Sequence, residues 1–274
     1  MSLLLGVLAG MAYGLSAFAG AFIALPLLVL AAGIGIHESL PIALFALGIC
    51  AAIAAGDAVR ARQCSITHAT WLIVGGVPMV LIAGWLAQFV SDTILSTLFL
   101  VAAIVFGPLL LSAGRAYRHR TAPPPASLLH APKRAFGESA QVFHFNATQR
   151  AATLFSGAGC GIMAALCAAP GSWIGWRILD RQMPGEAHLV VGTLTFSVAV
   201  VAILGAGFEF ALAPEIPGYV AGLFVLGAVS GMGIARRVHH LPLLRSSNTV
   251  MGVAVIILAL ALWVAVVSGA TPDA

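Results

Sequence analysis

Eight long apolar segments, separated by short polar stretches, follow one another along the chain. They cover residues 3–32, 39–56, 70–90, 94–114, 151–176, 187–208, 216–235 and 247–268. Most of them reach the roughly 20 residues that a helix needs to cross a bilayer. They are continuously apolar, whereas the strands of a membrane barrel alternate between apolar and polar residues. The pattern therefore predicts an all-α polytopic membrane protein that is surrounded by the lipid bilayer.

The composition agrees with a membrane protein and narrows its chemistry. Only 8% of the 274 residues are charged, against about 25% in ordinary soluble domains. The net charge of +4 is explained by the orientation of membrane loops, so we expect no nucleic-acid partner. The four cysteines have no CxxC spacing, and neither a disulfide framework nor a zinc site is indicated. We expect no cofactor and no metal.

The lysines and arginines form four clusters, at residues 60–62, 115–150, 177–181 and 236–245. Cytoplasmic loops carry the excess of such residues, so all four clusters should lie inside. They do so only if segment 151–176 enters from the cytoplasm, turns near mid-membrane and leaves on the same side. This topology, in a bacterial-type inner membrane, makes both termini extracytoplasmic and the stretch 115–150 cytoplasmic.

The same topology places three acidic residues, Asp92, Glu209 and Glu215, in loops outside the membrane. The length of the first apolar segment raises the same question of a hairpin. Thirty residues in one helix would measure about 45 Å, against an apolar bilayer core of about 30 Å. A second re-entrant hairpin fits this length better, although a single tilted helix stays open.

The two halves of the chain repeat the same order of segments. A shift of 150 residues places 10–21 on 160–171, and both stretches are rich in small residues with a glycine-centred break. Three further apolar segments follow each of them. Because three crossings are an odd number, the second half should be inverted relative to the first. We therefore predict a first repeat at 1–114, a cytoplasmic linker at 115–150 and a second repeat at 151–274, each repeat consisting of a re-entrant or broken helical hairpin and three transmembrane helices.

The run from Gly14 to Leu28 resembles the Gly-Ile-Gly-Gly-Gly…Pro-Leu-Leu signature that opens each half of the sulfite exporter TauE/SafE family. The stretch from Arg60 to Ile66 is similar to the basic loop that this family has after its second segment. Where the family has consecutive glycines, this chain has Ala-Gly-Ala at 19–21 and Pro-Gly-Ser at 170–172. The resemblance implies export or exchange of sulfite, of sulfonates such as sulfoacetate, or of related anions.

Each hairpin tip is a candidate site for an anion. A helix that begins at a re-entrant tip directs free amide groups and the positive end of its dipole into the protein. Small side chains permit close approach of the backbone, serine hydroxyls can donate hydrogen bonds, and a proline favours a helix start. The expected substrate-binding residues at the tips are Ser16, Ala19, Gly20, Ala21, Pro170, Gly171 and Ser172. Close packing of membrane helices is the alternative role of the small residues.

Three polar residues near the second tip complete the predicted site. Arg177 lies six residues after Gly171, about 9 Å along a helix, and either serves as counter-ion of the substrate or reaches to the interface. Thr193 and Ser197 are four residues apart on one helical face and either line the cavity or bond to carbonyls of their own helix.

Other ionisable residues have simpler expected roles. Asp57 is expected to form an interfacial pair with Arg60, and His37 and His188 are candidates for proton coupling.

These observations favour a secondary transporter that holds a small anion between two opposed tips near the membrane midplane and works by alternating access. An anion channel is the alternative within transport, because tips lined with amide groups would also conduct anions. A membrane-embedded enzyme is disfavoured, because no intramembrane carboxylate pair or nucleophile elbow is present. The sequence leaves open the substrate, the direction, the coupling ion, either proton or sodium, and the oligomeric state, a homodimer included.

Overall fold

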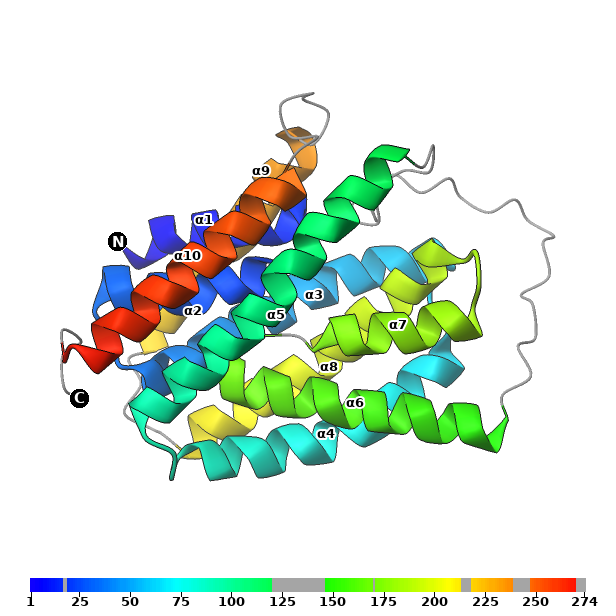
Figure 1. The fold of residues 1–274 in the computed structure, drawn as a ribbon, viewed down its shortest axis with the longest axis horizontal. Coiled ribbons are helices and arrows are strands. Elements are labelled where there is room, and N and C mark those ends of the chain that lie inside the picture. The colour runs from blue at the N-terminus through cyan, green and yellow to red at the C-terminus, as the bar shows by residue number, and fades with distance from the viewer. Residues whose placement is uncertain (17–18, 120–145, 170, 213–217, 239–246, 270–274) are drawn as a thin grey trace.

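The computed structural model describes residues 1–16, 19–119, 146–169, 171–212, 218–238 and 247–269, without the side chains of 19, 109–119, 238 and 247–249. This part of the chain forms ten helices (Figure 1). In chain order they are α1 (Ser2–Leu15), α2 (Ala19–Ala32), α3 (Ile36–Arg60), α4 (Ile66–Ala87), α5 (Asp92–His119), α6 (Ala147–Cys167), α7 (Ser172–Gln182), α8 (Ala187–Leu212), α9 (Gly218–Val238) and α10 (Ser247–Val267).

The predicted fold class, an all-α polytopic membrane protein, is confirmed. Within the described residues, six helices are long and apolar enough to cross a membrane: α3, α4, α6, α8, α9 and α10. Large apolar side chains also cover the outer surface of the bundle, as at Val101 of α5 and Leu260 of α10, which are 54% and 51% exposed. Such a surface is stable against lipid tails and would be unstable in water.

The first apolar segment folds as two helices, as the hairpin interpretation predicted, and not as one tilted helix. α1 and α2 have 14 residues each. The chain turns between them and α2 packs back against α1, so that Gly20 lies directly on the backbone of Tyr13. Each limb measures about 21 Å at 1.5 Å per residue, which is shorter than the apolar core of a bilayer.

The second hairpin also breaks where the sequence predicted, but its two limbs differ in length. α6 has 21 residues and α7 has 11. Asn146 and Gln149 form a capping box that starts α6 four residues before the apolar segment begins. α6 therefore measures about 31 Å, longer than the half-length limb that we predicted. Ala168, with φ of 46°, ends the helix in the left-handed conformation.

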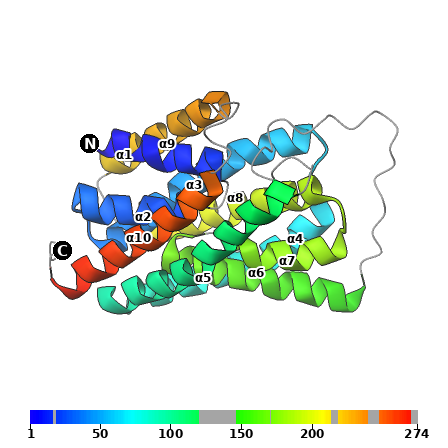
Figure 2. The same cartoon turned by 45° about the horizontal axis from the view of Figure 1, so that its top comes forward.

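The first helix of each hairpin packs in parallel against a helix of the other half (Figure 2). Along α1 and α9, Gly6 faces Phe224 and Gly14 faces Met232. α6 and α4 repeat this arrangement. Along that pair, the facing residues are Gly157 with Leu72 and Gly161 with Val80. Glycines on these faces let the two backbones touch, as in the small-xxx-small interfaces of membrane helices.

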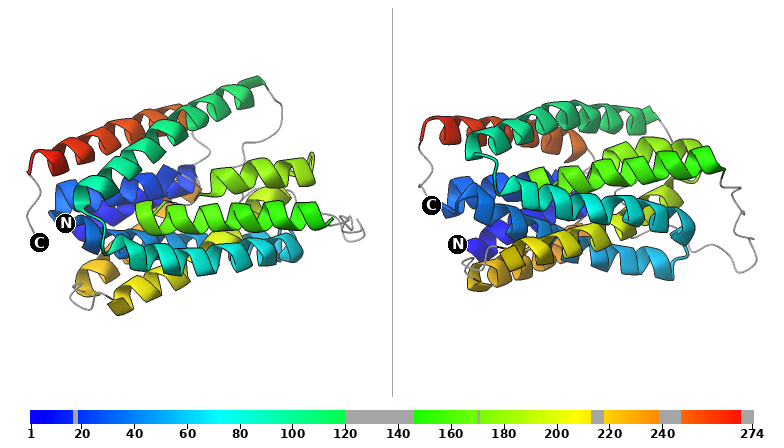
Figure 3. Two further views of the ribbon diagram at one scale, coloured as in Figure 1. Left: turned by 60° about the horizontal axis from the view of Figure 1, so that its bottom comes forward. Right: turned by 90° about the horizontal axis from the view of Figure 1, so that it is seen from below.

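Helices that hold the same position in the two predicted repeats run antiparallel to each other. In the α3 and α8 pair, Gly48 faces Ile203 whereas Ala58 faces Gly192. In the α5 and α10 pair, Gly107 packs on Ile256, and the indole Nε1 of Trp263 donates a hydrogen bond of 3.1 Å to Thr97 Oγ1. Both views in Figure 3 show α5 and α10 as a layer on one side of the remaining helices.

The described basic side chains outside α7 gather at one end of the bundle, which we call the basic end. There, Asp57 of α3 pairs with Arg236 of α9 at 3.1 Å, and the Arg150 guanidinium of α6 lies 6.0 Å from the centre of the Trp71 ring of α4. We call the opposite end, where α3 begins and where α4 and α8 end, the His37 end. In Figure 1, the basic end, where α6 starts, lies toward the right, and the His37 end, where α1 and α5 start, lies toward the left.

Candidate functional site

The first hairpin tip lies between Ser16 and Gly20. Ser16 ends α1 with an extended backbone, its N–H donates to the Ala12 carbonyl, and it is buried. Ala19 begins α2, and Gly20 and Ala21 follow as buried residues. Residues 17–18 lie outside the described part of the chain. The tip therefore combines a buried hydroxyl with the N-terminus of α2, which are two groups that attract an anion.

The second tip has the same composition of groups. Gly171 precedes α7, and Ser172, the first residue of that helix, is fully buried. Pro170, which we predicted as a helix-start signal, lies outside the described residues. Each tip thus combines a buried serine with the N-terminus of a helix, although Ser16 follows the end of α1 whereas Ser172 begins α7.

The glycines at both tips have a packing role that the structure makes explicit. A Cβ atom on Gly20 would lie 2.5 Å from Tyr13 Cα, and one on Gly171 would lie 2.7 Å from Cys160 Cα. Both neighbours belong to the first helix of the same hairpin. Real Cβ atoms do not approach so closely, so each glycine is required for its hairpin to close. Larger residues there would disturb the fold as well as any bound substrate.

The two predicted hydroxyls on α8 are buried and bond to backbone groups. Thr193 Oγ1 donates to the Leu189 carbonyl at 2.6 Å and accepts a hydrogen bond of 2.9 Å from the Ser65 amide. Ser197 Oγ donates to the Thr193 carbonyl at 2.8 Å. Both hydroxyls therefore bond to a carbonyl of their own helix, and Ser197 also lines a small cavity between α3, α4, α6 and α8. Thr193 in addition fixes the α3–α4 loop to α8.

This double role of Thr193 leads to a prediction. Thr193→Val should lower the free energy of unfolding by about 1–2 kcal/mol, because the Ser65 amide loses its acceptor, whereas Thr193→Ser keeps the hydroxyl and should stay near the native value. Thermal unfolding of the purified protein in detergent measures the difference. Equal unfolding temperatures for the valine and serine variants would contradict it.

Two small cavities lie beside the hairpins. One, of ≈ 20 Å³, is bordered by α3, α4, α6 and α8, and its lining includes Cys160 and Ser197. The other, of ≈ 10 Å³, is bordered by α1, α2, α3 and α9, and its lining includes Tyr13, Gly20 and Cys50. Each holds about one water molecule at most. Neither has room for a sulfur oxyanion, so an anion would enter only after the helices around the hairpins have moved.

Arg177 is exposed on α7. An exposed guanidinium is strongly hydrated and screened, and it contributes less to binding an anion than a buried one. Its position favours the interfacial role over that of counter-ion.

A different arginine, Arg236, lies close to the first tip. The prediction that Asp57 pairs with Arg60 is wrong, because Asp57 Oδ2 contacts Arg236 Nη2 at 3.1 Å. The Arg236 side chain is 26% exposed, and its buried Nε has no hydrogen-bond partner among the described residues. Ala235, the preceding residue, faces Gly14 in the last turn of α1.

Sequence reasoning missed Arg236 because a basic residue at a helix end is normally read as an orientation signal. Nothing in the sequence indicates that the neighbouring arginines 236 and 237 have different roles. In the structure, Arg236 is partly buried and Arg237 is exposed. Only the packing of α9 against α1 and α3 distinguishes the two.

Glu209 also differs from the prediction, which placed it in a loop outside the membrane. α8 continues to Leu212, and the Glu209 side chain is buried within it. The sequence contains a signal for this longer helix, because apolar residues continue after Glu209, from Phe210 as far as Pro214. Among the described residues, no group of three or more His, Cys, Asp or Glu residues could hold a metal ion.

Similarity to known proteins extends over almost the whole chain. The model of one protein family, the sulfite exporter TauE/SafE family, matches residues 2–269. No curated protein and no solved structure matches the chain. The matched region includes both hairpins, all ten helices and the linker between the halves.

Proposed function

Because the chain belongs to the sulfite exporter TauE/SafE family, we propose that it is a secondary transporter of sulfite or of a small organosulfonate such as sulfoacetate. The family match over residues 2–269 carries this proposal. The protein is a multi-pass membrane protein of a transporter family, which favours transport over catalysis. The specific anion and the alternating-access mechanism are the parts that we propose.

We propose that the two halves form an inverted repeat. Three observations support this: each hairpin packs on a helix of the other half, the equivalent helices α3 and α8 run antiparallel, and so do α5 and α10. The gathering of the described basic side chains outside α7 at the basic end supports a cytoplasmic position of that end. The linker 115–150 would then be cytoplasmic, and both termini would lie outside the inner membrane.

The orientation leads to a prediction about the C-terminus. A reporter that is active only outside the cytoplasm should be active when it is fused after Ala274, and a reporter that is active only inside should be silent. The reverse result would contradict the inverted repeat. A fusion within the linker, at Pro124, is the matched control and should give the opposite pattern.

The anion site that we propose lies between the two tips. The N-termini of α2 and α7 supply amide groups, Ser16 and Ser172 supply hydroxyls, and Arg236 supplies a positive charge at the first tip. These groups suit an oxyanion with several acceptor oxygens and need no metal. Ala19, Gly20, Ala21 and Gly171 keep the backbones close. Since the cavities beside the hairpins hold about one water each, binding requires the hairpins to open, as alternating access demands.

The test is counterflow in proteoliposomes that contain the purified protein. Vesicles loaded with unlabelled sulfite should accumulate labelled sulfite transiently, because a carrier exchanges one anion for another. A channel gives no such overshoot, so its absence together with unsaturable flux would overturn the proposal in favour of a pore. Replacing sulfite with sulfoacetate, taurine or a small carboxylate in the same assay identifies the anion that competes best.

A further inference from the structure

A buried carboxylate without a partner lies far from the hairpin tips, at the His37 end of the bundle. Glu209 of α8 is 8% exposed. Both of its carboxylate oxygens are buried and have no hydrogen-bond partner among the described residues. An ionised carboxylate in this situation costs several kcal/mol unless a proton or a cation neutralises it. Its presence inside a membrane helix calls for a functional explanation.

Glu209 lines a cavity that is much larger than the two beside the hairpins. The cavity has a volume of ≈ 240 Å³ and is bordered by the start of α3 and the ends of α4 and α8. Its lining consists of His37, Leu40, Pro41, Gly84, Ala87, Gln88, Glu209 and Leu212. A site of this volume admits several water molecules. A carboxylate that lines such a space repels anions, so the cavity is unsuited to the transported oxyanion.

A glycine makes room for the carboxylate. A Cβ atom on Gly84 of α4 would lie 3.1 Å from Glu209 Oε1 and 3.4 Å from its Cγ. Alanine there would press on the carboxylate directly. The packing of α4 against α8 is therefore fitted to the glutamate side chain, which lies against the neighbouring helix instead of extending into the lipid.

A proton suits this site better than a metal cation. Ca²⁺ takes about six to eight oxygen ligands, and Mg²⁺ requires near-octahedral coordination. Among the described residues of the lining, side-chain oxygens come only from Glu209 and from the amide of Gln88. One imidazole, His37, shares the cavity, and an imidazole nitrogen can either donate or accept a hydrogen bond. Protonation removes the charge of Glu209 without any further ligand.

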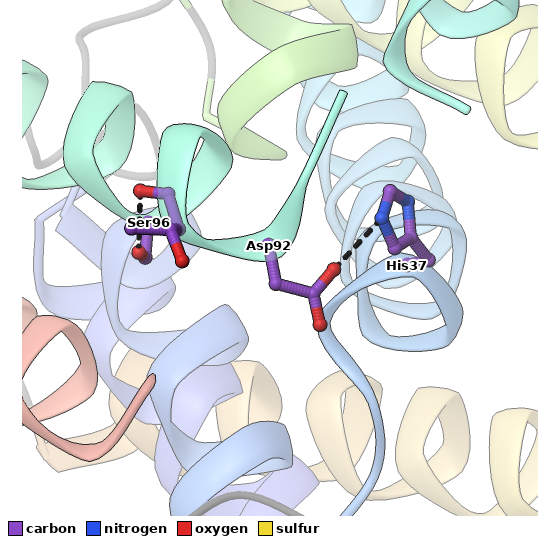
Figure 4. Close-up of polar contacts among 4 residues, drawn as sticks. His37, Asp92 and Ser96 are labelled. Atoms are coloured by element: carbon purple, nitrogen blue, oxygen red, sulfur yellow. Dashed lines mark hydrogen bonds and ion pairs between the residues drawn. The ribbon is translucent and has the colours of Figure 1, made fainter. Parts of the chain in front are cut away.

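His37 connects the cavity to the surface. Figure 4 shows its ring, at the start of α3, directed toward the Asp92 carboxylate at the start of α5. His37 Nε2 and Asp92 Oδ1 are 2.8 Å apart, and the two side chains are 41% and 49% exposed. A carboxylate at this distance fixes the orientation of the ring. The pair thus stands between the solution and the cavity that contains Glu209.

Other titratable groups on the helices around Glu209 are distant or do not line the cavity. Glu38 follows His37 on α3 but is absent from the lining. His68 lies at the other end of α4, 19 residues before Ala87 and hence about 28 Å away. His188 lies 21 residues before Glu209 on α8, about 31 Å away. Within the described residues, His37 is therefore the one other ionisable side chain that lines the cavity of Glu209.

We propose that Glu209 is a proton-binding site that couples anion transport to the proton gradient. The proposal rests on the transport function proposed above and names the coupling ion and its site. Glu209 takes a proton from the solution at the His37 end by way of the cavity, which neutralises the carboxylate, and it returns the proton to water when the site is hydrated. α8 also carries Ser197, 12 residues or about 18 Å away beside the second hairpin, so one helix joins the two sites.

The first test needs no transport and no variant. Infrared titration of the purified protein in detergent detects the carbonyl band of a protonated carboxylic acid. We expect one such band at neutral pH that disappears only at higher pH and that shifts when the protein contains ¹³C-labelled glutamate. It should be missing in Glu209→Gln and present in Asp180→Asn, which neutralises an exposed carboxylate of α7. A native protein without this band at neutral pH would overturn the proposal.

The second test measures proton movement in proteoliposomes. A pH-sensitive dye reports protons that accompany the anion, and the two variants are compared at equal anion flux, so that protons carried by the anion itself cancel. We expect the extra proton flux to vanish in Glu209→Gln and to persist in Asp180→Asn. Equal proton flux in both, or dependence on sodium instead of protons, would overturn the proposal. If the native protein shows no counterflow, the transport function fails, and the infrared band still decides whether Glu209 binds a proton.

Discussion

Replacing Arg236 with glutamine is expected to weaken sulfite binding by about ten- to a hundredfold and to reduce counterflow accordingly. The loss of one charge-assisted hydrogen bond is worth about 1.5–3 kcal/mol. The buried Nε of Arg236 has no partner among the described residues, so the guanidinium can still bind an anion while Nη2 stays on Asp57. Arg236→Lys should recover only part of the affinity, because lysine has no fork of donors.

The chain contains a matched control for this experiment. Arg237 is the next residue on α9 and carries the same charge, but it is exposed. Arg237→Gln should leave sulfite affinity near the native value and should remove the same contribution to membrane orientation. Affinity is measured on purified protein in detergent, where orientation has no effect. A similar loss of affinity in both variants would mean that Arg236 attracts the anion only as part of the summed positive charge of the basic end, and not through a direct hydrogen bond.

Adding one methyl group at Gly231 is expected to destabilise the protein by about 3 kcal/mol. A Cβ atom there would overlap the Val7 carbonyl oxygen and lie 2.9 Å from the Met11 amide nitrogen. Both are backbone atoms of α1, so no side-chain rotation relieves the clash, and the two helices must separate. Thermal unfolding in detergent should register Gly231→Ala as a clear loss of stability.

The control lies two residues away on the same helix. A Cβ on Gly233 would meet nothing within 4 Å. Gly233→Ala should be neutral or slightly stabilising, because alanine favours the helix by up to about 1 kcal/mol over glycine. The two substitutions are chemically identical, so opposite signs can only come from the α1 and α9 contact. If both variants unfold at the native temperature, the close approach of these backbones does not stabilise the fold.

The breaks in both hairpins were predictable from the sequence because they depend on local properties. The first apolar segment has thirty residues, too long for one span, whereas the second break follows from the basic clusters on both sides of segment 151–176. Small residues around Gly20 and Gly171 permit each turn. The difference in length between α6 and α7 was not predictable from apolarity. It depends on where α6 starts, and the capping box of Asn146 and Gln149 sets that start among polar residues.

The candidate site was predictable only in part. Ser16 and Ser172 were expected at the tips and are buried there. Arg177, chosen for its distance along the chain, is exposed, whereas Arg236 approaches the first tip from a helix more than two hundred residues further on in the sequence. Sequence distance predicts neighbours within one helix, and it carries no information about which helix of the other half lies alongside.

By itself, the sequence determined that this protein is a helical membrane protein, because the length of an apolar segment acts locally, and it predicted two similar halves from the repeated order of the segments. Tertiary structure decided which polar groups meet. It pairs Asp57 with Arg236 and not with Arg60. It leaves no space for a Cβ atom at Gly231 but open space at Gly233, and it buries the side chain of Glu209 inside the bundle. The physical reason is that apolar surface only requires burial and is nearly indifferent to its partner, whereas a charge or a backbone contact depends on the individual atoms that lie within a few ångströms of it.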